Sequence, residues 1–492
     1  MIDPQTRAKY TATIGIECHV QFKTQTKLFT GIGNDAREAA PNTLAGPLCF
    51  GLPGSLPVLN KEAVHLGIRA AFALGTPPQK FSAFDRKHYF YPDLPLGYQI
   101  TQFNNPIVRD GKVIVDVDGE AKTVRIHEAH LEADAGKSTH PAGTDYSLVD
   151  LNRAGTPLIE IVSEPDMHTP AEARAYAHEL YLLMRYADVS DCNLFYGNMR
   201  FDVNVSVSKT SELGTRTETK NLNSFRAVEK AAEYEIQRQI ELLEKGEAIV
   251  QETRGWNDAK QKTFTQRTKE DAHDYRYFPE PDIPPIVLDD EQIQTVEAEM
   301  PAMPNDWRAR LKALGLDKPS MELLLEAELD DAEVHYLPLI EETIADKDFA
   351  KAMANWFVNL EIPLRADESQ NLAKQTNQAR LNFYKQTYEL VKAGKLSSTN
   401  AKELLAKLLS TAEEVLSVED FAKQHNLIQE SNEGEISKIV AKVLEENPKA
   451  AEDVKNGELK AIGFLVGQVM KASQGKANPG LAQTLIKKQL GI

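Results

Sequence analysis

Residues 14–21 read Ile-Gly-Ile-Glu-Cys-His-Val-Gln, an alternation of apolar and polar side chains that predicts a β-strand with two unlike faces. Strand side chains alternate with period two, so one face carries Ile14, Ile16, Cys18 and Val20. The opposite face carries Glu17, His19 and Gln21. A strand face that only meets water usually shows Lys, Thr and Glu, whereas a carboxylate beside an imidazole is typical of a ligand-binding face.

The same pattern recurs further along the chain. Residues 200–207 read Arg-Phe-Asp-Val-Asn-Val-Ser-Val, which places an apolar face opposite Arg200, Asp202, Asn204 and Ser206. Polar residues at two-residue spacing also occur at His130, Glu132 and Asp134, and one carboxylate, Glu160, lies inside an apolar stretch. Carboxylates and imidazoles are ligands of hard or borderline divalent cations. The pattern alone leaves two interpretations open: a cation site with a phosphate-bearing substrate, or polar strand residues with a purely structural role.

The bulk composition indicates the broad class of protein. At 492 residues the chain is long enough for about three domains, each with its own core. Its three cysteines, Cys18, Cys49 and Cys192, are too few and too scattered for a disulfide framework, which indicates a reducing compartment. No apolar run is long enough to cross a bilayer, and the first residues lack the pattern of a signal peptide. We therefore predict a cytoplasmic protein without a membrane partner.

Two kinds of sequence follow one another along the chain. Residues 1–290 are rich in short alternating strands, with a hairpin turn expected at Asp118-Gly119 and helices expected from a capping box at Thr169 and after Ser224. This part is predicted to be an α+β domain with a mostly antiparallel sheet and helices packed on it. Residues 291–394 are predicted to form an all-α domain and residues 395–492 a further helical tail.

Charge is distributed unevenly. The formal net charge is −17, and acidic residues crowd residues 322–342. After Glu458 the only charged side chains are basic, namely Lys460, Lys471, Lys476, Lys487 and Lys488. Such lysines can hold a phosphate backbone locally, because salt screens the repulsion of distant carboxylates. The alternative is that they are simply a solvated surface.

Other stretches have both a functional and a structural interpretation. Residues 85–93, Asp-Arg-Lys-His-Tyr-Phe-Tyr-Pro-Asp, suit anion binding or a packed strand end. Residues 220–224 lead into a helix N-terminus that favours phosphate, although Asn223 or Ser224 could simply cap the helix. Residues 134–139 lack the first glycine of a phosphate-binding loop, so ATP binding here would not use one. Cys49 is expected to be a buried thiol rather than a nucleophile.

Long motifs in this chain resemble the B-subunit family of aspartyl/glutamyl-tRNA amidotransferases. They occupy residues 14–20, 85–93, 131–137, 150–166, 220–225, 274–282 and 475–479, so the resemblance spans essentially the whole chain. It implies a heterotrimeric, glutamine-hydrolysing ligase in which an amidase-like A-subunit frees ammonia and a small C-subunit braces the pair. The B-subunit would use ATP and Mg²⁺ to phosphorylate the side-chain carboxylate of Glu or Asp on misacylated tRNA, and ammonia would displace the phosphate. The implied fold is a cradle-like α+β catalytic domain, a helical domain and a tail resembling YqeY proteins.

The resemblance also implies residue roles. Mg²⁺ would be held by Glu17, His19, Glu132 and Glu160. Nucleotide would be bound by Asp202, Asn204, Lys220 and Asn223. The catalytic residues would be Lys87, Tyr89, Glu132 and Asp202, with Lys87 neutralising phosphate or the substrate carboxylate. The tail would contact tRNA through the five lysines that follow Glu458.

One departure from the family concerns zinc. Many members carry two pairs of cysteines before the segment matched here by Gly51–Pro57, whereas this chain has Thr30, Ile32 and Gly46 at three of those places and retains only Cys49. A structural zinc site normally takes four ligands. We therefore expect no zinc, with local packing in its place.

Two other classes of function remain open at this level. One is a stand-alone metal-dependent phosphotransferase or hydrolase, and the other is a non-catalytic tRNA-binding scaffold. The polar strand faces argue against the scaffold. The sequence does not distinguish Glu-tRNA(Gln) from Asp-tRNA(Asn) as substrate.

Overall fold

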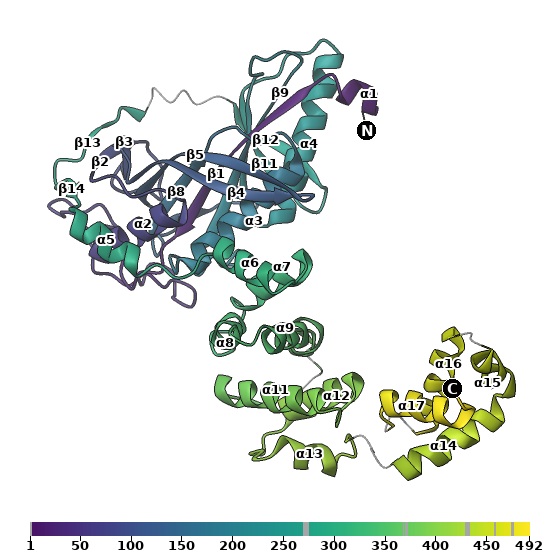
Figure 1. Cartoon of the computed structure of the whole chain (residues 1–492). Coiled ribbons are helices and arrows are strands. Elements are labelled where there is room, and N and C mark those ends of the chain that lie inside the picture. The colour runs from purple at the N-terminus through teal and green to yellow at the C-terminus, as the bar shows by residue number, and fades with distance from the viewer. Residues whose placement is uncertain are drawn as a thin grey trace. The chain divides into compact units, whose positions relative to one another are not determined.

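The computed structural model describes residues 2–268, 275–367, 369, 372–428, 433–456, 459–473 and 477–492. It divides into two compact units, Met1–Pro304 and Asn305–Ile492, each of which is described by itself. Unit 1 combines a large sheet with a few helices, and unit 2 is helical (Figure 1). The α+β prediction with a helical C-terminal region is confirmed. The three-part division at residues 290 and 394 remains a prediction.

Unit 1 is built on a twelve-stranded sheet in the order β12-β11-β10-β9-β1-β8-β5-β3-β2-β13, with β4 paired to β5 and β14 to β2. All its pairings are antiparallel except β10 with β11. The strands are β1 (Thr11–Gln21), β2 (Phe81–His88), β3 (Tyr98–Asn105), β4 (Val108–Val117), β5 (Glu120–Ala133), β8 (Pro157–Ser163), β9 (Met199–Ser208), β10 (Thr217–Leu222), β11 (Glu252–Asn257), β12 (Lys262–Thr268), β13 (Phe278–Pro279) and β14 (Ile286–Val287). A separate two-stranded sheet pairs β6 (Lys137–Thr139) with β7 (Leu148–Asp150).

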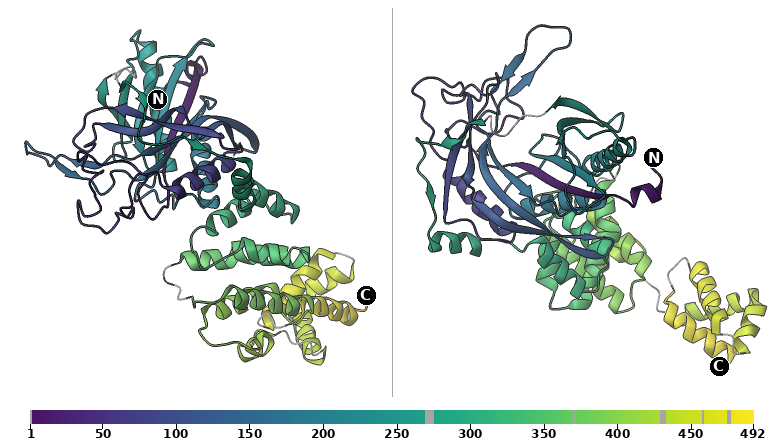
Figure 2. Two further views of the ribbon diagram at one scale, coloured as in Figure 1. Left: turned by 90° about the vertical axis from the view of Figure 1, so that its left-hand side faces the viewer. Right: turned by 90° about the horizontal axis from the view of Figure 1, so that it is seen from above.

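The helices that bury side chains in the core on the apolar side of this sheet are α2 (Lys61–Ala73), α3 (Pro170–Tyr186), α4 (Phe225–Glu244) and α5 (Asp290–Ala298). The short helix α1 (Pro4–Arg7) has no buried residue. The apolar side chains of β1 share one buried core with residues of α3 and α4 such as Tyr176, Leu180 and Ile236. Figures 1 and 2 show α3 and α4 lying along the sheet. Because strand side chains alternate, this packing leaves the polar face of β1 on the other side.

Local signals predicted several of these boundaries. The β4–β5 hairpin turns at Asp118 and Gly119, both with positive φ (54° and 89°), as a tight hairpin requires. Ser224 caps α4 by accepting a hydrogen bond from the Ala227 amide. Thr169 likewise caps α3 by accepting a hydrogen bond from the Glu172 amide. The Glu172 carboxylate accepts in turn from the His168 amide and from Lys122 of β5.

Unit 2 contains α6 (Pro304–Ala313), α7 (Lys318–Ala327), α8 (Leu337–Thr343), α9 (Lys347–Trp356), a π-helical turn (Phe357–Glu361), α10 (Ile362–Ala366), α11 (Asn377–Lys392), α12 (Ser398–Ser410), α13 (Val418–Gln424), α14 (Glu433–Glu446), α15 (Pro448–Lys455), α16 (Leu459–Ala472) and α17 (Pro479–Leu490). Around the π-helical turn, the buried Glu361 carboxylate accepts from Arg380 and from Tyr384. The last four helices bury a separate apolar cluster that includes Val440, Leu465 and Ile486.

Candidate active site

The register of three central strands brings the polar faces together. β1 pairs with β8 on one side and β9 on the other, which places His19 opposite Glu160 and also opposite Arg200. Two residues earlier, Glu17 lies opposite Asp202. β5 continues the face beyond β8, with His130 opposite Glu160. Side chains from four strands therefore project from one surface of the sheet.

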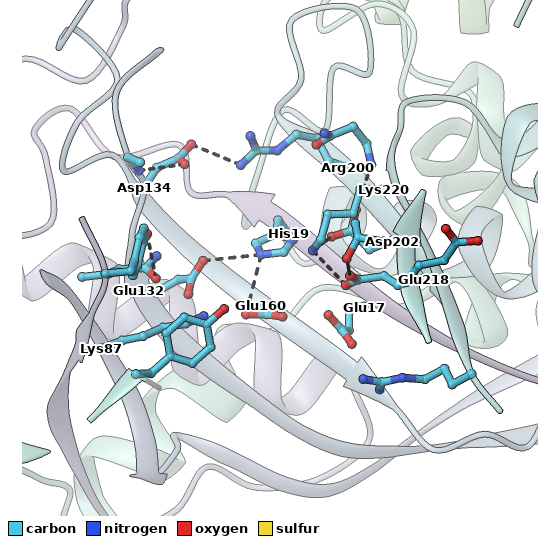
Figure 3. A pocket seen from close by; sticks show the side chains of 18 of the residues that line it. Glu17, His19, Lys87, Glu132, Asp134, Glu160, Arg200, Asp202, Glu218 and Lys220 are labelled. Atoms are coloured by element: carbon cyan, nitrogen blue, oxygen red, sulfur yellow. Dashed lines mark hydrogen bonds and ion pairs between the residues drawn. The ribbon is translucent and has the colours of Figure 1, made fainter. Parts of the chain in front are cut away.

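Except for His130, these side chains line a cavity of about 440 Å³. Figure 3 labels ten of the residues that line it. The sides are completed by Tyr89, Gln99, Arg216, Asn221 and Tyr275. The lining is unusually rich in charged groups, with carboxylates and cations interleaved. Such a cavity suits a charged ligand rather than an apolar one.

The first group of possible metal ligands consists of His19, Glu132 and Glu160, each of which offers an atom within 4.8 Å of the others. His19 Nε2 lies 3.5 Å from Glu132 Oε1 and 3.6 Å from Glu160 Oε2 (Figure 3). Behind them, His130 Nε2 lies 3.1 Å from Glu160 Oε2. The sequence pattern includes His130 but gives it no role, and the structure places it as the group that holds Glu160.

Electrostatics in this first group favours ionised carboxylates. Burial alone would lower the pKa of His130, but Glu128, Glu132 and Glu160 beside it raise that pKa well above its usual range. Burial would likewise raise the pKa of Glu160, yet His19, His130 and Lys87 hold it well below its usual range. Glu160 is therefore a carboxylate with its charge available to a cation.

The second group consists of Glu17, Asp202 and Glu218, again with ligand atoms within 4.8 Å of one another. Lys220 Nζ bridges two of them, at 3.0 Å from Asp202 Oδ2 and 2.8 Å from Glu218 Oε1 (Figure 3). Asp202 Oδ1 accepts the backbone N–H of Asn221. Three carboxylates thus share one lysine, which leaves the group acidic.

This excess of negative charge is visible in Glu17. Burial, followed by the charges of Glu160 and Glu218, raises the pKa of Glu17 to about 7. Its Oε1 accepts a hydrogen bond from Asn204 Nδ2 at 3.0 Å, while the buried Asn204 Oδ1 has no partner. A carboxylate in this state is stabilised when a cation joins it. The donor set therefore fits a hard divalent cation.

Lys87, Tyr89 and Asp134 border the first group. Burial opposes the charge on Lys87, but Tyr277, Glu132 and Glu160 nevertheless raise its pKa. Its Nζ lies 4.8 Å from the centre of the Tyr275 ring. Burial and the nearby Glu132 carboxylate raise the pKa of Tyr89. Asp134 Oδ2 lies 3.1 Å from Arg200 NH2 and 3.1 Å from Arg153 Nε.

Comparison with known proteins agrees with this geometry. Residues 12–294 match the profile of the GatB/GatE catalytic domain, and residues 338–490 match that of the GatB domain. The chain belongs to the GatB family. It is 45% identical over 487 residues to the aspartyl/glutamyl-tRNA(Asn/Gln) amidotransferase B-subunit of Thermoanaerobacter sp., covering 98% of this chain and 99% of the relative. The corresponding B-subunits of Carboxydothermus hydrogenoformans and Thermodesulfovibrio yellowstonii are 43% and 42% identical, each over 98% of this chain and 99% of the relative.

The structure brings most of the residues expected from the GatB resemblance into one cavity. These are Glu17, His19, Lys87, Tyr89, Glu132, Glu160, Asp202 and Lys220. The four carboxylate and imidazole residues assigned to one Mg²⁺ are divided, since Glu17 lies in the second group and the other three in the first. Asn204 lies behind Glu17, and the exposed Asn223 is not among the lining residues, whereas Asn221 is.

Sequence reasoning missed Glu218, Arg200 and Asn221 as site residues. A signal existed for the first two. Arg200 shares a polar face with Asp202 at two-residue spacing, and Glu218 shares one with Lys220. For Asn221 the alternation of side chains gave no signal. A bulge between Thr219 and Leu222 breaks the alternation and turns the backbone N–H of Asn221 toward Asp202.

The region where many GatB members carry cysteines is held here by other contacts. The Lys27 side chain is fully buried, and its Nζ donates to the carbonyl oxygens of Leu44 and Ala154, at 2.7 Å each, with Cys49 Sγ at 3.5 Å. A Cβ placed on Gly46 would lie 3.0 Å from Ile32 Cγ1, so these two positions pack together. Cys49 is buried, as expected. In the described part of the chain, both triads of possible metal ligands lie elsewhere.

The predicted tRNA contacts fall in unit 2. Lys460 and Lys471 are exposed on α16, and Lys487 and Lys488 are exposed on α17. Lys476 lies outside the described residues. No helix among the described residues is both long and apolar enough to span a bilayer.

Proposed function

We propose that this chain is the subunit of an aminoacyl-tRNA amidotransferase that activates and amidates the side-chain carboxylate of Glu or Asp carried on tRNA. The single observation that supports this most directly is the pair of carboxylate groups, each with its own lysine, on the floor of one cavity. Phosphoryl transfer depends mainly on positioning and charge neutralisation, which such a site offers. The relatives are aspartyl/glutamyl-tRNA(Asn/Gln) amidotransferase B-subunits, which supplies the substrate class.

The proposed reaction has two steps. A side-chain carboxylate oxygen of the aminoacyl group attacks the γ-phosphorus of ATP, and the bond from that phosphorus to the bridging oxygen of ADP breaks. The resulting acyl phosphate has a good leaving group, which the free carboxylate lacks. Ammonia then attacks the carbonyl carbon, phosphate leaves with the electron pair of the C–O bond, and the surplus proton passes to solvent or base. The products are an amide, phosphate and ADP.

Two positions in the cavity suit Mg²⁺. The first would be held by His19, Glu132 and Glu160, and the second by Glu17, Asp202 and Glu218. Mg²⁺ would supply charge neutralisation for the phosphate oxygens of ATP. The raised pKa of Glu17 and the partnerless Asn204 Oδ1 beside it support the second position. Carboxylate oxygens outnumber imidazoles in both groups, which is the preference of a hard cation.

The remaining cations position the reactants. Lys220 is within reach of the second group and is proposed to bind nucleotide phosphate together with Asp202 and Asn204. Lys87 lies beside Glu132 and Glu160 and is proposed to hold the carboxylate that becomes phosphorylated. Tyr89, whose hydroxyl lies 3.5 Å from Gln99 Oε1, borders the same end of the cavity and stays protonated, so it can donate to a phosphate or carbonyl oxygen.

Partners complete the proposed enzyme. Ammonia would come from an amidase-like A-subunit, with a small C-subunit in the same heterotrimer, and the tail lysines would contact the misacylated tRNA. The chain on its own is not expected to release ammonia from glutamine, because Cys49 is buried beside Lys27 and no histidine of the described residues is hydrogen-bonded to it.

The decisive experiment measures ATP hydrolysis by the purified complex. We expect hydrolysis to require Mg²⁺ and to rise strongly with Glu-tRNA(Gln) or Asp-tRNA(Asn), but not with the correctly charged Gln-tRNA(Gln), which lacks a carboxylate to phosphorylate. The chain alone serves as the control for glutaminase activity. ATP hydrolysis that is indifferent to the aminoacyl-tRNA would favour the stand-alone phosphotransferase. Amidation without any ATP would refute the activation step.

A further inference from the structure

A second cavity, of about 350 Å³, lies at the end of β1 and is not used by the chemistry above. We call it the nucleoside pocket, and its relevant lining residues are Gln21, Asn34, Arg37, Arg153, Tyr196 and Asn198. They come from the end of β1, from the loop that follows it, from the loop before β8 and from the turn before β9. Three cations and two carboxylates line it, which is a basic balance in a chain of net charge −17.

The nucleoside pocket adjoins the active-site cavity. Gln21 stands two residues beyond His19 on the same face of β1, which separates them by about 7 Å along the strand. An ion-pair bridge also links the two cavities: Asp134, which lines the active-site cavity, binds Arg200 there and Arg153 of the nucleoside pocket. Along β1 the second group of possible metal ligands, which contains Glu17, therefore comes first. The first group, which contains His19, follows it, and the nucleoside pocket comes last.

Two amides in this pocket have enclosed oxygens without a hydrogen-bond partner. Asn34 is only 4% exposed, and its Nδ2 donates to Phe22 O and to Thr24 O over long distances of 3.3 Å each. Asn34 Oδ1 then has no hydrogen-bond partner. Asn198 donates to Gln21 Oε1 at 3.1 Å, and its Oδ1 also has none. Both oxygens are enclosed by protein in this conformation. A ligand N–H can therefore reach them only when the amide group rotates by a small angle.

An aromatic ring and a guanidinium group complete the pocket. Tyr196 is 50% exposed, and Arg37 Cζ lies 5.9 Å from the centre of its ring. Asp35 holds the Arg37 guanidinium in a bidentate pair, at 2.7 and 2.6 Å. Aromatic rings stack on nucleobases, and guanidinium groups bind phosphate. Unpartnered carbonyl oxygens call for a ligand with N–H donors, such as an exocyclic amine.

We propose that the nucleoside pocket receives the 3′-terminal adenosine of the aminoacyl-tRNA. The inference rests on the proposed function, because the aminoacyl group is esterified to that adenosine. When the side-chain carboxylate of the aminoacyl group lies beside His19 and Lys87, the nucleoside must lie the length of that one amino acid away from them. The nucleoside pocket begins at this distance. The adenine ring stacks on Tyr196 and offers its N6 amine to the amide oxygens of Asn34 and Asn198. Arg37 and Arg153 face the phosphate that precedes it.

The adenine of ATP is the other source of the same chemistry. The order of sites along β1 disfavours it, because the proposed phosphate-binding group at Glu17 and Asp202 lies on the opposite side of His19. An ATP molecule bound there would have to extend across the reacting carboxylate to place its base in the nucleoside pocket. The experiment separates the two sources.

The first test changes the base of each substrate in turn. The complex is assayed for amidation with aminoacyl-tRNA ending in inosine instead of adenosine, since inosine replaces the N6 amine with a carbonyl. We expect kcat/KM for this tRNA to fall by about tenfold or more, on the scale of losing one hydrogen bond to a buried acceptor. Replacing ATP with ITP should leave kcat/KM for the nucleotide within about twofold of its value with ATP. The reverse pattern would assign the pocket to ATP, and no change in either arm would overturn the proposal.

The second test changes the protein. Tyr196→Ala should raise KM for aminoacyl-tRNA about tenfold, on the scale of one lost stacking contact, with KM for ATP unchanged, and Tyr196→Phe should restore it. Tyr146→Ala is the matched control, because Tyr146 is similarly exposed, at 56%, and does not line the pocket. An equal effect of both alanine variants would refute the stacking role. Wild-type amidation with unmodified tRNA is measured first, so failure of the proposed function would be seen separately.

Discussion

Replacing Lys27 with Met tests how this chain stabilises the region where relatives are expected to use cysteines. Lys27 lies between two loops, one containing Leu44 and the other Ala154. Its ammonium group donates to a carbonyl oxygen of each loop at 2.7 Å, with a longer bond of 3.3 Å to Leu151 O. The side chain is fully buried, so water cannot replace these donors. Methionine keeps the volume of the stem but removes the cation.

The magnitude follows from what the substitution leaves behind. A buried carbonyl oxygen without a partner costs about 1–3 kcal/mol, so two of them cost about 2–6 kcal/mol. Removing the ammonium also recovers the free energy of desolvating it, which burial makes large enough to lower the pKa of Lys27. The net loss should be about 3 kcal/mol, and at about 1.4 kcal/mol per factor of ten the open form of the loops becomes more than a hundredfold more populated.

Hydrogen exchange of backbone amides at residues 42–52 measures this population directly. We expect protection there to fall about a hundredfold in Lys27→Met, while amides of β1 and β9 keep theirs. Lys23→Met is the matched control, because Lys23 is four residues away and pairs with the exposed Asp188. Unchanged protection in Lys27→Met, or an equal loss in Lys23→Met, would refute the idea that the buried ammonium joins the two loops.

Four further predictions concern the metal groups, zinc, the tail and acid stability. Glu132→Gln and His19→Ala should each lower the rate of amidation by about 10²–10³ in an assembled complex, and near-normal turnover at limiting Mg²⁺ would remove that residue from the metal site. Zinc analysis of the chain without purification tags should find well under one equivalent, and a stoichiometric, chelator-resistant zinc would show that other ligands had been recruited. Truncation before Ser397 should raise KM for tRNA and reduce the salt dependence of binding, and equal titrations of both forms at two salt concentrations would contradict a tRNA-binding tail. Burial opposes ionisation of Glu235, but hydrogen bonds from Arg238 and Thr263 and the charge of Arg254 lower its pKa. The ionised carboxylate therefore stabilises the fold above about pH 4.5, and this stabilisation is lost as pH falls through the lowered pKa. Glu235→Gln should destabilise the fold at pH 7 and much less at pH 3, as urea unfolding at both pH values will show.

The sequence predicted which side chains share a face of each central strand, but not which other strands pair with it. Alternation alone placed Glu17 and His19 on one side of β1, because a buried apolar face requires a period of two. It could not show that β9 lies on one side of β1 and β8 on the other, since pairing depends on contacts between distant segments. As a result, one metal site was predicted where the structure has two groups of ligands.

β10 shows why part of the site was missed. β10 reads Thr-Glu-Thr-Lys-Asn-Leu, so a single apolar side chain, Leu222 at its end, is available from which to recognise the strand. The other buried side chains are Thr217 and Thr219, and the Thr217 hydroxyl donates to the buried Glu235 carboxylate of α4 at 2.8 Å. A hydrogen-bonded network here takes the place of hydrophobic packing. Patterns based on apolar residues cannot find such a strand, and Glu218 was missed with it.

The position of β1 shows how one strand could serve both substrates of the phosphoryl transfer that we propose. Glu17 joins Asp202 and Glu218, which lie on β9 and β10, whereas His19 joins Glu160 and Glu132, which lie on β8 and β5. Because the two residues are two positions apart on a rigid strand, the two groups are held about 7 Å apart. Each group has its own lysine, Lys220 for the first and Lys87 for the second. A phosphate donor neutralised at one group and a carboxylate held at the other would meet between them. In the proposed reaction, the central pairing of β1 with β8 and β9 would therefore set the distance over which the phosphoryl group moves.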